Sequence, residues 1–258
     1  MTGVLLITGG SRGIGAATAA IAARRGHSLA INYRADREAA EAVVEDARKQ
    51  GVEAAAIQAD VSREADVLAL FSQVEERLGP LGALVNSAGV TLPPTPAAEA
   101  DAEALERLLS VNVLGTMLCC REAARRLSQR RGGPGGAIVN VSSMAAAMGG
   151  RPGASHYAAS KAAVDAFTVG FAREVADDGI RVNAVRPGMT LTDMTDQLRQ
   201  DPALATRISA TIGMNRVASA EEIAQPILWL LSDEASFVSG ALLDASGGGF
   251  VIGPRQEG

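Results

Sequence analysis

Short apolar segments alternate with longer amphipathic segments along the whole chain. The short segments predict seven strands, at Val4–Ile7, Ser28–Tyr33, Glu53–Gln58, Ala83–Asn86, Ala137–Val141, Arg181–Val185 and Ala241–Asp244. The longer segments predict helices at Gly13–Arg25, Arg37–Gln50, Glu64–Leu78, Asp101–Gln129, Ser155–Asp178 and Ala220–Leu231. Strands that are apolar along their length and separated by helices are typical of a parallel sheet covered on both faces. We therefore expect an α/β fold with a doubly wound parallel sheet of about seven strands.

We expect one domain, spanning residues 1–258. The length suits one large α/β domain, and no stretch has the composition of a linker. Two segments interrupt the alternation: residues 90–100 carry three prolines, which exclude regular structure, and an insertion at about 189–215 precedes the last helix. Ligands of open α/β sheets bind beyond the carboxyl ends of the strands. The insertion is therefore a candidate lid over a substrate pocket.

Composition and charge argue against several classes of protein. The net charge of −5 argues against broad nucleic-acid binding, and four arginines within residues 125–131 are expected to form a solvated helix end. The long uncharged stretch 132–150 is broken by glycines and a proline, so we expect no membrane span. The adjacent Cys119 and Cys120 match neither a zinc pattern nor a disulfide framework, so we expect no metal site. Because the strand-like run Val4–Ile7 starts almost at once, we expect no signal peptide and a cytoplasmic protein.

A glycine-rich loop follows the first predicted strand. Residues 8–15 read TGGSRGIG and lead directly into a helix. Glycines let the backbone turn tightly and approach a pyrophosphate, while the helix N-terminus supplies aligned N–H donors. The spacing Gly-x-x-x-Gly-x-Gly differs from the commoner Gly-x-Gly-x-x-Gly. Its position between the first strand and the first helix nevertheless predicts a Rossmann-type dinucleotide site.

The end of the second predicted strand bears on which dinucleotide binds. Folds that bind NAD usually place an acidic residue there for the ribose 2′-hydroxyl, whereas this chain has Asn32, Tyr33 and Arg34. A guanidinium binds phosphate oxygens in bidentate fashion, so Arg34 is expected to pair with a 2′-phosphate, with Arg12 within reach of the same group. NADP is therefore favoured over NAD as the cofactor.

Tyr157 and Lys161 lie four residues apart, on one face of a predicted helix, and follow the pair Ser142 and Ser143. A nearby positive charge favours the phenolate form of a tyrosine, whose ordinary pKa is about 10. Alone, such a pair also occurs by chance on exposed helices. Beside a dinucleotide site, it suggests proton transfer.

Further motifs lie along the chain: Asn86-Ser87-Ala88-Gly89, Asn112, Arg181–Gly188 and Gly240–Asp244. With the glycine loop and the Tyr157–Lys161 pair, they make the chain resemble the short-chain dehydrogenase/reductase family in its single-domain form, in the family's order and at its usual distances. The chain is similar to the sugar- and polyol-dehydrogenase-like members. At Ser87 the family usually has a second asparagine, which is mostly structural, so we expect a small stability effect and retained activity.

The resemblance implies roles for four residues. Tyr157 would be the general acid/base, and Lys161 would lower its pKa and hydrogen-bond the nicotinamide ribose. Ser143, rather than the adjacent Ser142, would orient the substrate oxygen, and Asn112 would anchor a proton relay ending at Lys161 through a water. Because the nicotinamide would carry the hydride, the protein would position the substrate and the cofactor and transfer the proton.

The resemblance also implies the cofactor contacts. Besides Arg34, Tyr157 and Lys161, they are Gly9, Ser11, Arg12 and Ile14 at the phosphates and ribose, Asp60 and Val61 at the adenine, Asn86, Ala88 and Gly89 on the ribose side, and Pro187, Gly188, Met189 and Thr192 at the carboxamide.

The resemblance thus implies an NADP-dependent oxidoreductase acting on a small-molecule carbonyl/secondary alcohol pair. The alternatives are an NAD-dependent dehydrogenase of a sugar or polyol and a non-catalytic NADP-binding redox sensor; retention of all four catalytic positions argues against the sensor. The family usually forms homotetramers through the helices at 101–129 and 155–178, with a dimer as the alternative. On the second of these helices, Asp165 and Glu174 are expected to face solvent or a neighbouring subunit.

Overall fold

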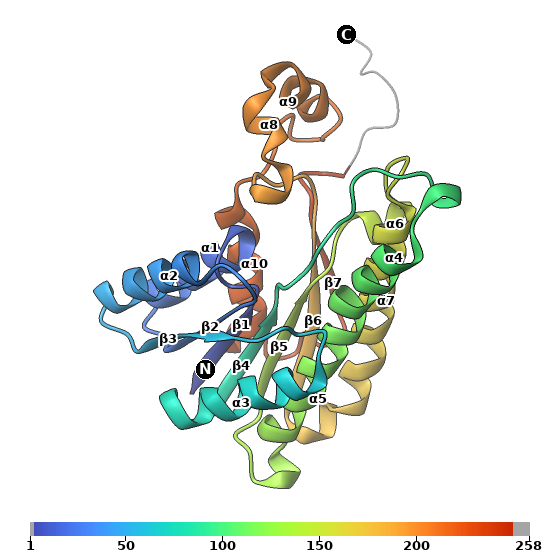
Figure 1. Cartoon of the computed structure of the whole chain (residues 1–258). Coiled ribbons are helices and arrows are strands. Elements are labelled where there is room, and N and C mark those ends of the chain that lie inside the picture. The colour runs from blue at the N-terminus through green and yellow to red at the C-terminus, as the bar shows by residue number, and fades with distance from the viewer. Residues whose placement is uncertain (1–2, 250–258) are drawn as a thin grey trace.

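The structure is a computed structural model that describes residues 3–249. Seven parallel strands form one sheet in the order β3-β2-β1-β4-β5-β6-β7 (Figure 1). The strands are β1 Val4–Thr8, β2 Leu29–Tyr33, β3 Ala54–Gln58, β4 Leu81–Asn86, β5 Gly136–Val141, β6 Ile180–Pro187 and β7 Leu242–Ala245. The strand order reverses between β1 and β4, which is where ligands bind in folds of this kind. The prediction of a doubly wound sheet of seven strands is confirmed.

Helices cover both faces of the sheet (Figure 1). One face carries α1 (Gly13–Arg24), α2 (Arg37–Lys49) and α10 (Ala220–Leu231), and its core is largely built from alanine, leucine, isoleucine and valine. The other face carries α3 (Glu64–Leu78), α5 (Thr116–Leu127) and α7 (Ser155–Glu174), with Phe71 fully buried at its centre. One apolar core therefore lies on each face of the sheet, and together they hold the carboxyl ends of the strands in place.

The helix predicted at 101–129 is interrupted, which corrects the sequence analysis. It consists of α4 (Ala102–Leu109), a π-helical turn (Ser110–Gly115) and α5. At Gly115 the chain passes so close to the neighbouring loop that a Cβ there would lie 2.9 Å from Cγ2 of Val61. A π turn contains one residue more than an α turn and often occurs at a functional site. The helix predicted at 155–178 likewise ends at Glu174 and is followed by a short 3₁₀ turn.

The segment from 189 to 215, the candidate lid, lies beyond the carboxyl ends of the strands (Figure 1). It contains a 3₁₀ turn at Asp193–Thr195 and the short helices α8 (Gln197–Gln200) and α9 (Pro202–Ser209). Its base is tied to the body where Thr190 pairs with Ala218 and the Leu191 N–H donates to the Ala218 carbonyl at 2.9 Å. Another helix, α6 (Ala145–Met148), follows β5, and the proline-rich segment includes a 3₁₀ turn at Ala97–Glu99.

The arginines near the end of α5 take part in ion pairs. Glu122, almost fully buried, accepts from Arg125 at 2.8 Å and from Arg126 at 2.9 Å, and Arg130 pairs with Asp178. The cluster is therefore more than a solvated helix end. Within residues 3–249, no helix is both long and apolar enough to cross a bilayer, and no group of three or more His, Cys, Asp or Glu side chains is arranged to hold a metal ion.

Candidate active site

The four predicted catalytic residues are contributed by three parts of the fold at the carboxyl edge of the sheet. Asn112 belongs to the π turn, Ser143 follows the end of β5, and Tyr157 and Lys161 occupy the first two turns of α7. A side chain at Gly89, just after β4, would lie 3.5 Å from both Asn112 Oδ1 and Lys161 Nζ. The chain therefore brings the end of β4, the π turn and α7 together at one point.

The adjacent serines have different partners. Ser143 forms a hydrogen bond with the Tyr157 phenol, whereas the Ser142 hydroxyl donates to the Lys161 carbonyl at 3.2 Å. Burial raises the pKa of Tyr157, and the Ser143 hydrogen bond lowers it without reversing the net upward shift. Tyr157 is therefore held as a neutral phenol at ordinary pH, with Ser143 beside its oxygen.

Lys161 is buried, with 6% of its surface exposed. Its Nζ donates to the Val141 carbonyl at 2.8 Å and lies 5.9 Å from the centre of the Tyr157 ring. Burial lowers the pKa of Lys161 to about 8, because a charged ammonium is poorly solvated there. In the chain itself, burial and the Ser143 hydroxyl are the causes that act on the Tyr157 pKa.

Asn112 joins the π turn to its surroundings through its side chain. Its Oδ1 accepts from the Val90 N–H at 2.8 Å, and its Nδ2 donates to the Val90 carbonyl at 2.9 Å and to Ser160 Oγ at 3.0 Å. Ser160 in turn donates to the Tyr157 carbonyl at 2.7 Å. Asn112 is thereby connected to the backbone of α7 through Ser160.

The glycine loop passes from β1 to the N-terminus of α1. A Cβ at Gly9 would lie 2.7 Å from Ala88 Cα, and one at Gly15 would lie 2.4 Å from the Gly9 carbonyl oxygen, so the loop packs too closely for larger residues. Helix α1 begins without a side-chain cap and without an acidic residue in its first turn. The helix N-terminus therefore presents N–H groups suited to an anion such as a pyrophosphate.

Both arginines proposed for the 2′-phosphate are exposed and lie near carboxylates. Arg34 Nη1 is 4.0 Å from Asp60 Oδ2, and Arg12 Nε is 3.9 Å from Asp193 at the base of the lid. Asp60 is itself held by Ser62, whose hydroxyl donates to Oδ1 at 2.6 Å. Such long, exposed pairs are weak, and the guanidinium groups remain accessible to an anionic ligand.

The remaining predicted cofactor residues lie along the same edge, but not all offer a side chain to it. Asn86 is buried, and its Nδ2 donates to Asn140 Oδ1 at 2.9 Å. Val61 is buried against the π turn, and Ile14 packs against the core beneath the glycine loop. Pro187 is the last residue of β6, and the others lie in the loops that follow β1, β4 and β6, at Gly9, Ser11, Ala88, Gly89, Gly188, Met189 and Thr192.

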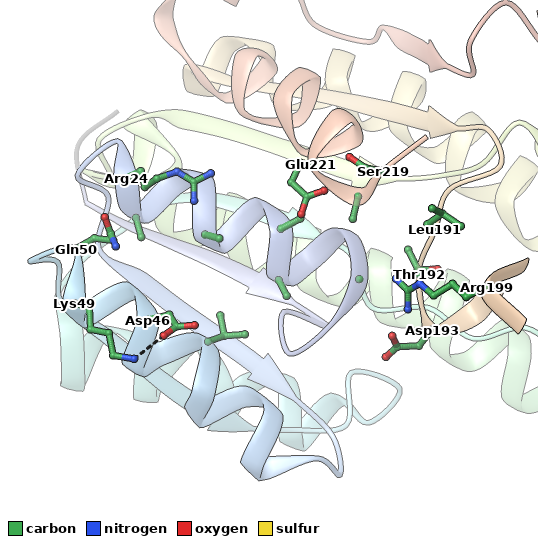
Figure 2. A pocket seen from close by; sticks show the side chains of 17 residues that line it. Arg24, Asp46, Lys49, Gln50, Leu191, Thr192, Asp193, Arg199, Ser219 and Glu221 are labelled. Atoms are coloured by element: carbon green, nitrogen blue, oxygen red, sulfur yellow. Dashed lines mark hydrogen bonds and ion pairs between the residues drawn. The ribbon is translucent and has the colours of Figure 1, made fainter. Parts of the chain in front are cut away.

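A groove of about 650 Å³ runs along the outer side of α1, between α2 and α10 (Figure 2). Alanines of α1 form its floor, and Leu191, Thr192 and Asp193 close one end. Of the predicted site residues, only Thr192 lines it. The groove is therefore separate from the predicted catalytic residues and reaches only the edge of the predicted cofactor site.

The chain was compared with known proteins. A family model described as Enoyl-(Acyl carrier protein) reductase matches residues 9–249. The uncharacterized oxidoreductase YgfF of Escherichia coli (strain K12) is 46% identical over 245 residues, covering 95% of this chain and 99% of YgfF. The 3-oxoacyl-[acyl-carrier-protein] reductase FabG of Staphylococcus aureus is 37% identical over 251 residues, covering 97% of this chain and 99% of FabG. The chain belongs to the short-chain dehydrogenase/reductase family. As a short-chain dehydrogenase/reductase, it is an NAD(P)-dependent oxidoreductase.

Sequence reasoning missed two polar residues near the centre of this short-chain dehydrogenase/reductase. Ser160 bridges Asn112 and Tyr157, and its position directly before Lys161 was the available signal. Asp165 was expected to face solvent or a subunit, but it is only 8% exposed and pairs with Arg186. Glu174 is exposed, as expected of a surface position. The partner of Asp165 lies on a distant strand, so helical periodicity alone could not identify it.

Proposed function

We propose that the protein transfers hydride between NADP(H) and a carbonyl/secondary alcohol substrate, with Tyr157 as the general acid/base. The hydrogen bond between Tyr157 and Ser143, next to buried Lys161, carries this proposal. A substrate carbonyl oxygen that accepts from both hydroxyl groups is polarised by Ser143 and protonated by Tyr157. The upward pKa shift of Tyr157 suits the reducing direction, because it keeps the phenol able to donate a proton.

The cofactor supplies the hydride at its nicotinamide ring, and the chain's own residues supply binding, orientation and the proton. The uncapped N-terminus of α1 and the crowded glycines at positions 9 and 15 fit a pyrophosphate that approaches the backbone closely. Lys161, beside Gly89, is proposed to hold the nicotinamide ribose. Its positive charge favours the phenolate that Tyr157 forms after proton donation.

Arg34 supports the choice of NADP over NAD. It lies at the end of β2, is exposed, and has only a weak pair with Asp60 to give up. We expect Arg34→Asp to weaken NADPH binding by about 100-fold, since charge-assisted hydrogen bonds contribute about 1.5–3 kcal/mol, and to leave NADH binding nearly unchanged. Fluorescence titration with both cofactors measures this. Equal losses for NADPH and NADH would contradict the assignment of Arg34 to the 2′-phosphate.

The substrate class has a second candidate. Relatives at 37% and 35% identity are named 3-oxoacyl-[acyl-carrier-protein] reductases, so a 3-oxoacyl thioester belongs among the carbonyl compounds to test. The sugar or polyol class expected from sequence is tested in the same panel, in the oxidising direction. A single pattern of rates across thioesters, simple ketones and polyols distinguishes these candidates.

The deciding experiment combines that panel with Tyr157→Phe. Wild-type protein is expected to oxidise NADPH in the presence of at least one carbonyl compound, and the phenylalanine variant is expected to bind NADPH but turn over at least 100-fold more slowly. Binding of NADPH without turnover by the wild type would favour the redox-sensor alternative. An active phenylalanine variant would refute the role of Tyr157.

We further propose a homotetramer in the cytoplasm, as the family resemblance implies. Light scattering of the purified protein tests the first part, with a dimer as the alternative outcome. Fractionation of cells that produce the protein tests the second.

A further inference from the structure

Asp165 is a buried carboxylate one helical turn beyond Lys161 on α7. Positions four residues apart share one face of a helix, so Asp165 follows Lys161 on the side that packs against the sheet. Only 8% of Asp165 is exposed. A buried charge is costly unless partners compensate it, so its retention here requires an explanation.

The groups that face Asp165 come from β6 and from the residue that follows β5. Arg186 Nη1 on β6 is 3.8 Å from Asp165 Oδ2, and Ser142, which follows β5, lies close enough to lower the pKa of the same carboxyl group. Arg186 has a second acidic partner, Asp244 on β7, at 2.8 Å from its Nε. Ser142 also donates to the Lys161 carbonyl. The Asp165–Arg186 pair therefore connects α7 to β6, and the Ser142 hydrogen bond connects α7 to the end of β5.

Lys161 has few groups that favour its charged form. Its Nζ donates to one backbone carbonyl, that of Val141, and burial lowers its pKa to about 8. Asp165 is the charged group that opposes this decrease. The other groups near Lys161 are neutral at ordinary pH: Tyr157 on the same helix and Asn112 in the π turn. Arg186 and Asp244 face Asp165 rather than Lys161.

We propose that Asp165 is a positioning residue that keeps Lys161 protonated at the working pH and holds its helix against β5 and β6. The effect of Asp165 on catalysis rests on the proposed function of Lys161. The effect of Asp165 on the charge of Lys161 does not depend on that function. A neutral Lys161 loses the electrostatic attraction that favours the Tyr157 phenolate. Asp165 thus acts on the reaction through Lys161, without touching the substrate.

The composition of the chain allows a direct test. It contains two lysines, Lys49 and Lys161. Protein labelled with carbon-13 at the lysine ε-carbon therefore gives two lysine signals, and Lys161→Arg identifies which is which. Lys49 is exposed on α2 beside Asp46, far from the site in sequence and fold, and serves as an internal reference. Following both signals against pH measures the midpoint at which each ammonium loses its proton.

In Asp165→Asn, the Lys161 midpoint is expected to fall by about 1 pH unit or more relative to wild type, while that of Lys49 stays fixed. Asp244→Asn is the matched control, because it removes the closer carboxylate of Arg186 but does not face Lys161. It should leave the Lys161 midpoint in place. An unchanged Lys161 midpoint in Asp165→Asn, or an equal fall in both variants, would overturn the proposal.

A measurement on the wild type covers the case in which Asp165→Asn fails to fold. The Lys161 signal, followed against pH, must then show a second inflection at the pH where Asp165 becomes protonated. The absence of that inflection overturns the proposal equally.

Turnover measurements then separate this inference from the proposed function. If the wild type reduces a carbonyl compound, Asp165→Asn should lose activity at a lower alkaline pH than wild type, whereas a purely structural defect lowers activity equally at every pH. If no compound is turned over, the proposed function fails, yet the lysine midpoints still decide the role of Asp165.

Discussion

The predicted catalytic residues and the candidate lid, residues 189–215, lie at the same edge of the sheet but differ in how firmly they are held. Asn112 is fully buried with three side-chain hydrogen bonds, and Lys161 is 6% exposed. In the lid, Met194 and Met214 are 50% and 66% exposed, and few side chains, such as Leu198, are buried. A segment with few buried contacts opens at little free-energy cost, whereas a buried polar network does not. The proposed proton transfer therefore lies in the firmly held part of this molecule, and the candidate lid lies in the loosely held part.

Substitution of the adjacent Ser142 and Ser143 is expected to give the largest difference in activity among the residues around Tyr157. Ser143→Ala removes the group that hydrogen-bonds Tyr157 and should lower kcat by roughly 100-fold or more. Ser142→Ala removes a hydrogen bond to the Lys161 carbonyl and should cost less than about 10-fold. Steady-state kinetics of both variants with one substrate makes the comparison. Equal losses would show that the two hydroxyl groups are not functionally distinct.

Lys161→Met is expected to stabilise the protein at neutral pH. The folded-state pKa of Lys161, about 8, lies below its unfolded value of 10.5, so protonating it in the fold costs free energy at pH below 8. The gain at pH 7 is roughly 3 kcal/mol, and it should shrink as pH rises from 8 to 10.5 and vanish above that range. Denaturant unfolding of both proteins across this range measures the difference. A difference independent of pH would contradict this account.

Removing one side-chain amide from each region, at Asn112 in the π turn and at Gln197 in α8, compares how strongly the two regions stabilise the fold. Asn112→Ala leaves the Val90 N–H and carbonyl and Ser160 without their partner and should lower the free energy of unfolding by about 2 kcal/mol. Gln197→Ala, on exposed α8 of the lid, should change it by less than about 0.5 kcal/mol. Denaturant unfolding of the pair at one pH is the measurement. Similar losses would mean that the lid is held as firmly as the π turn.

One methionine in each region extends this comparison to substrate binding. Met194→Ala, in the lid, should leave stability within about 0.5 kcal/mol of wild type while changing KM several-fold. Met144→Ala, at a position 9% exposed after β5, should instead cost about 2 kcal/mol. Thermal unfolding and kinetics of both variants compare the regions. Unchanged KM values for every substrate in Met194→Ala would remove that methionine from substrate choice.

Much of the fold follows from the sequence because apolar periodicity reports which faces are buried. All seven predicted strands exist with ends shifted by only one or two residues. The motifs also identified the residues that gather around Gly89. What periodicity cannot reveal is a pairing between distant segments. The burial of Asp165 depends on Arg186 of β6, and the different partners of Ser142 and Ser143 depend on how α7 packs against β5.

The π turn at 110–115 also sets the rotational phase of the helix that follows it. Each residue of an α-helix advances the chain by about 100° around the axis, so one additional residue offsets everything downstream by that angle. The stripe of α5 that includes Cys119, Ala123 and Leu127 is turned toward the sheet with this offset in place. Deleting a single residue of the turn would swing that stripe away and direct charged side chains inward. A surface loop tolerates the insertion or deletion of one residue, whereas the same change in the π turn is expected to disrupt the packing of α5 against the sheet.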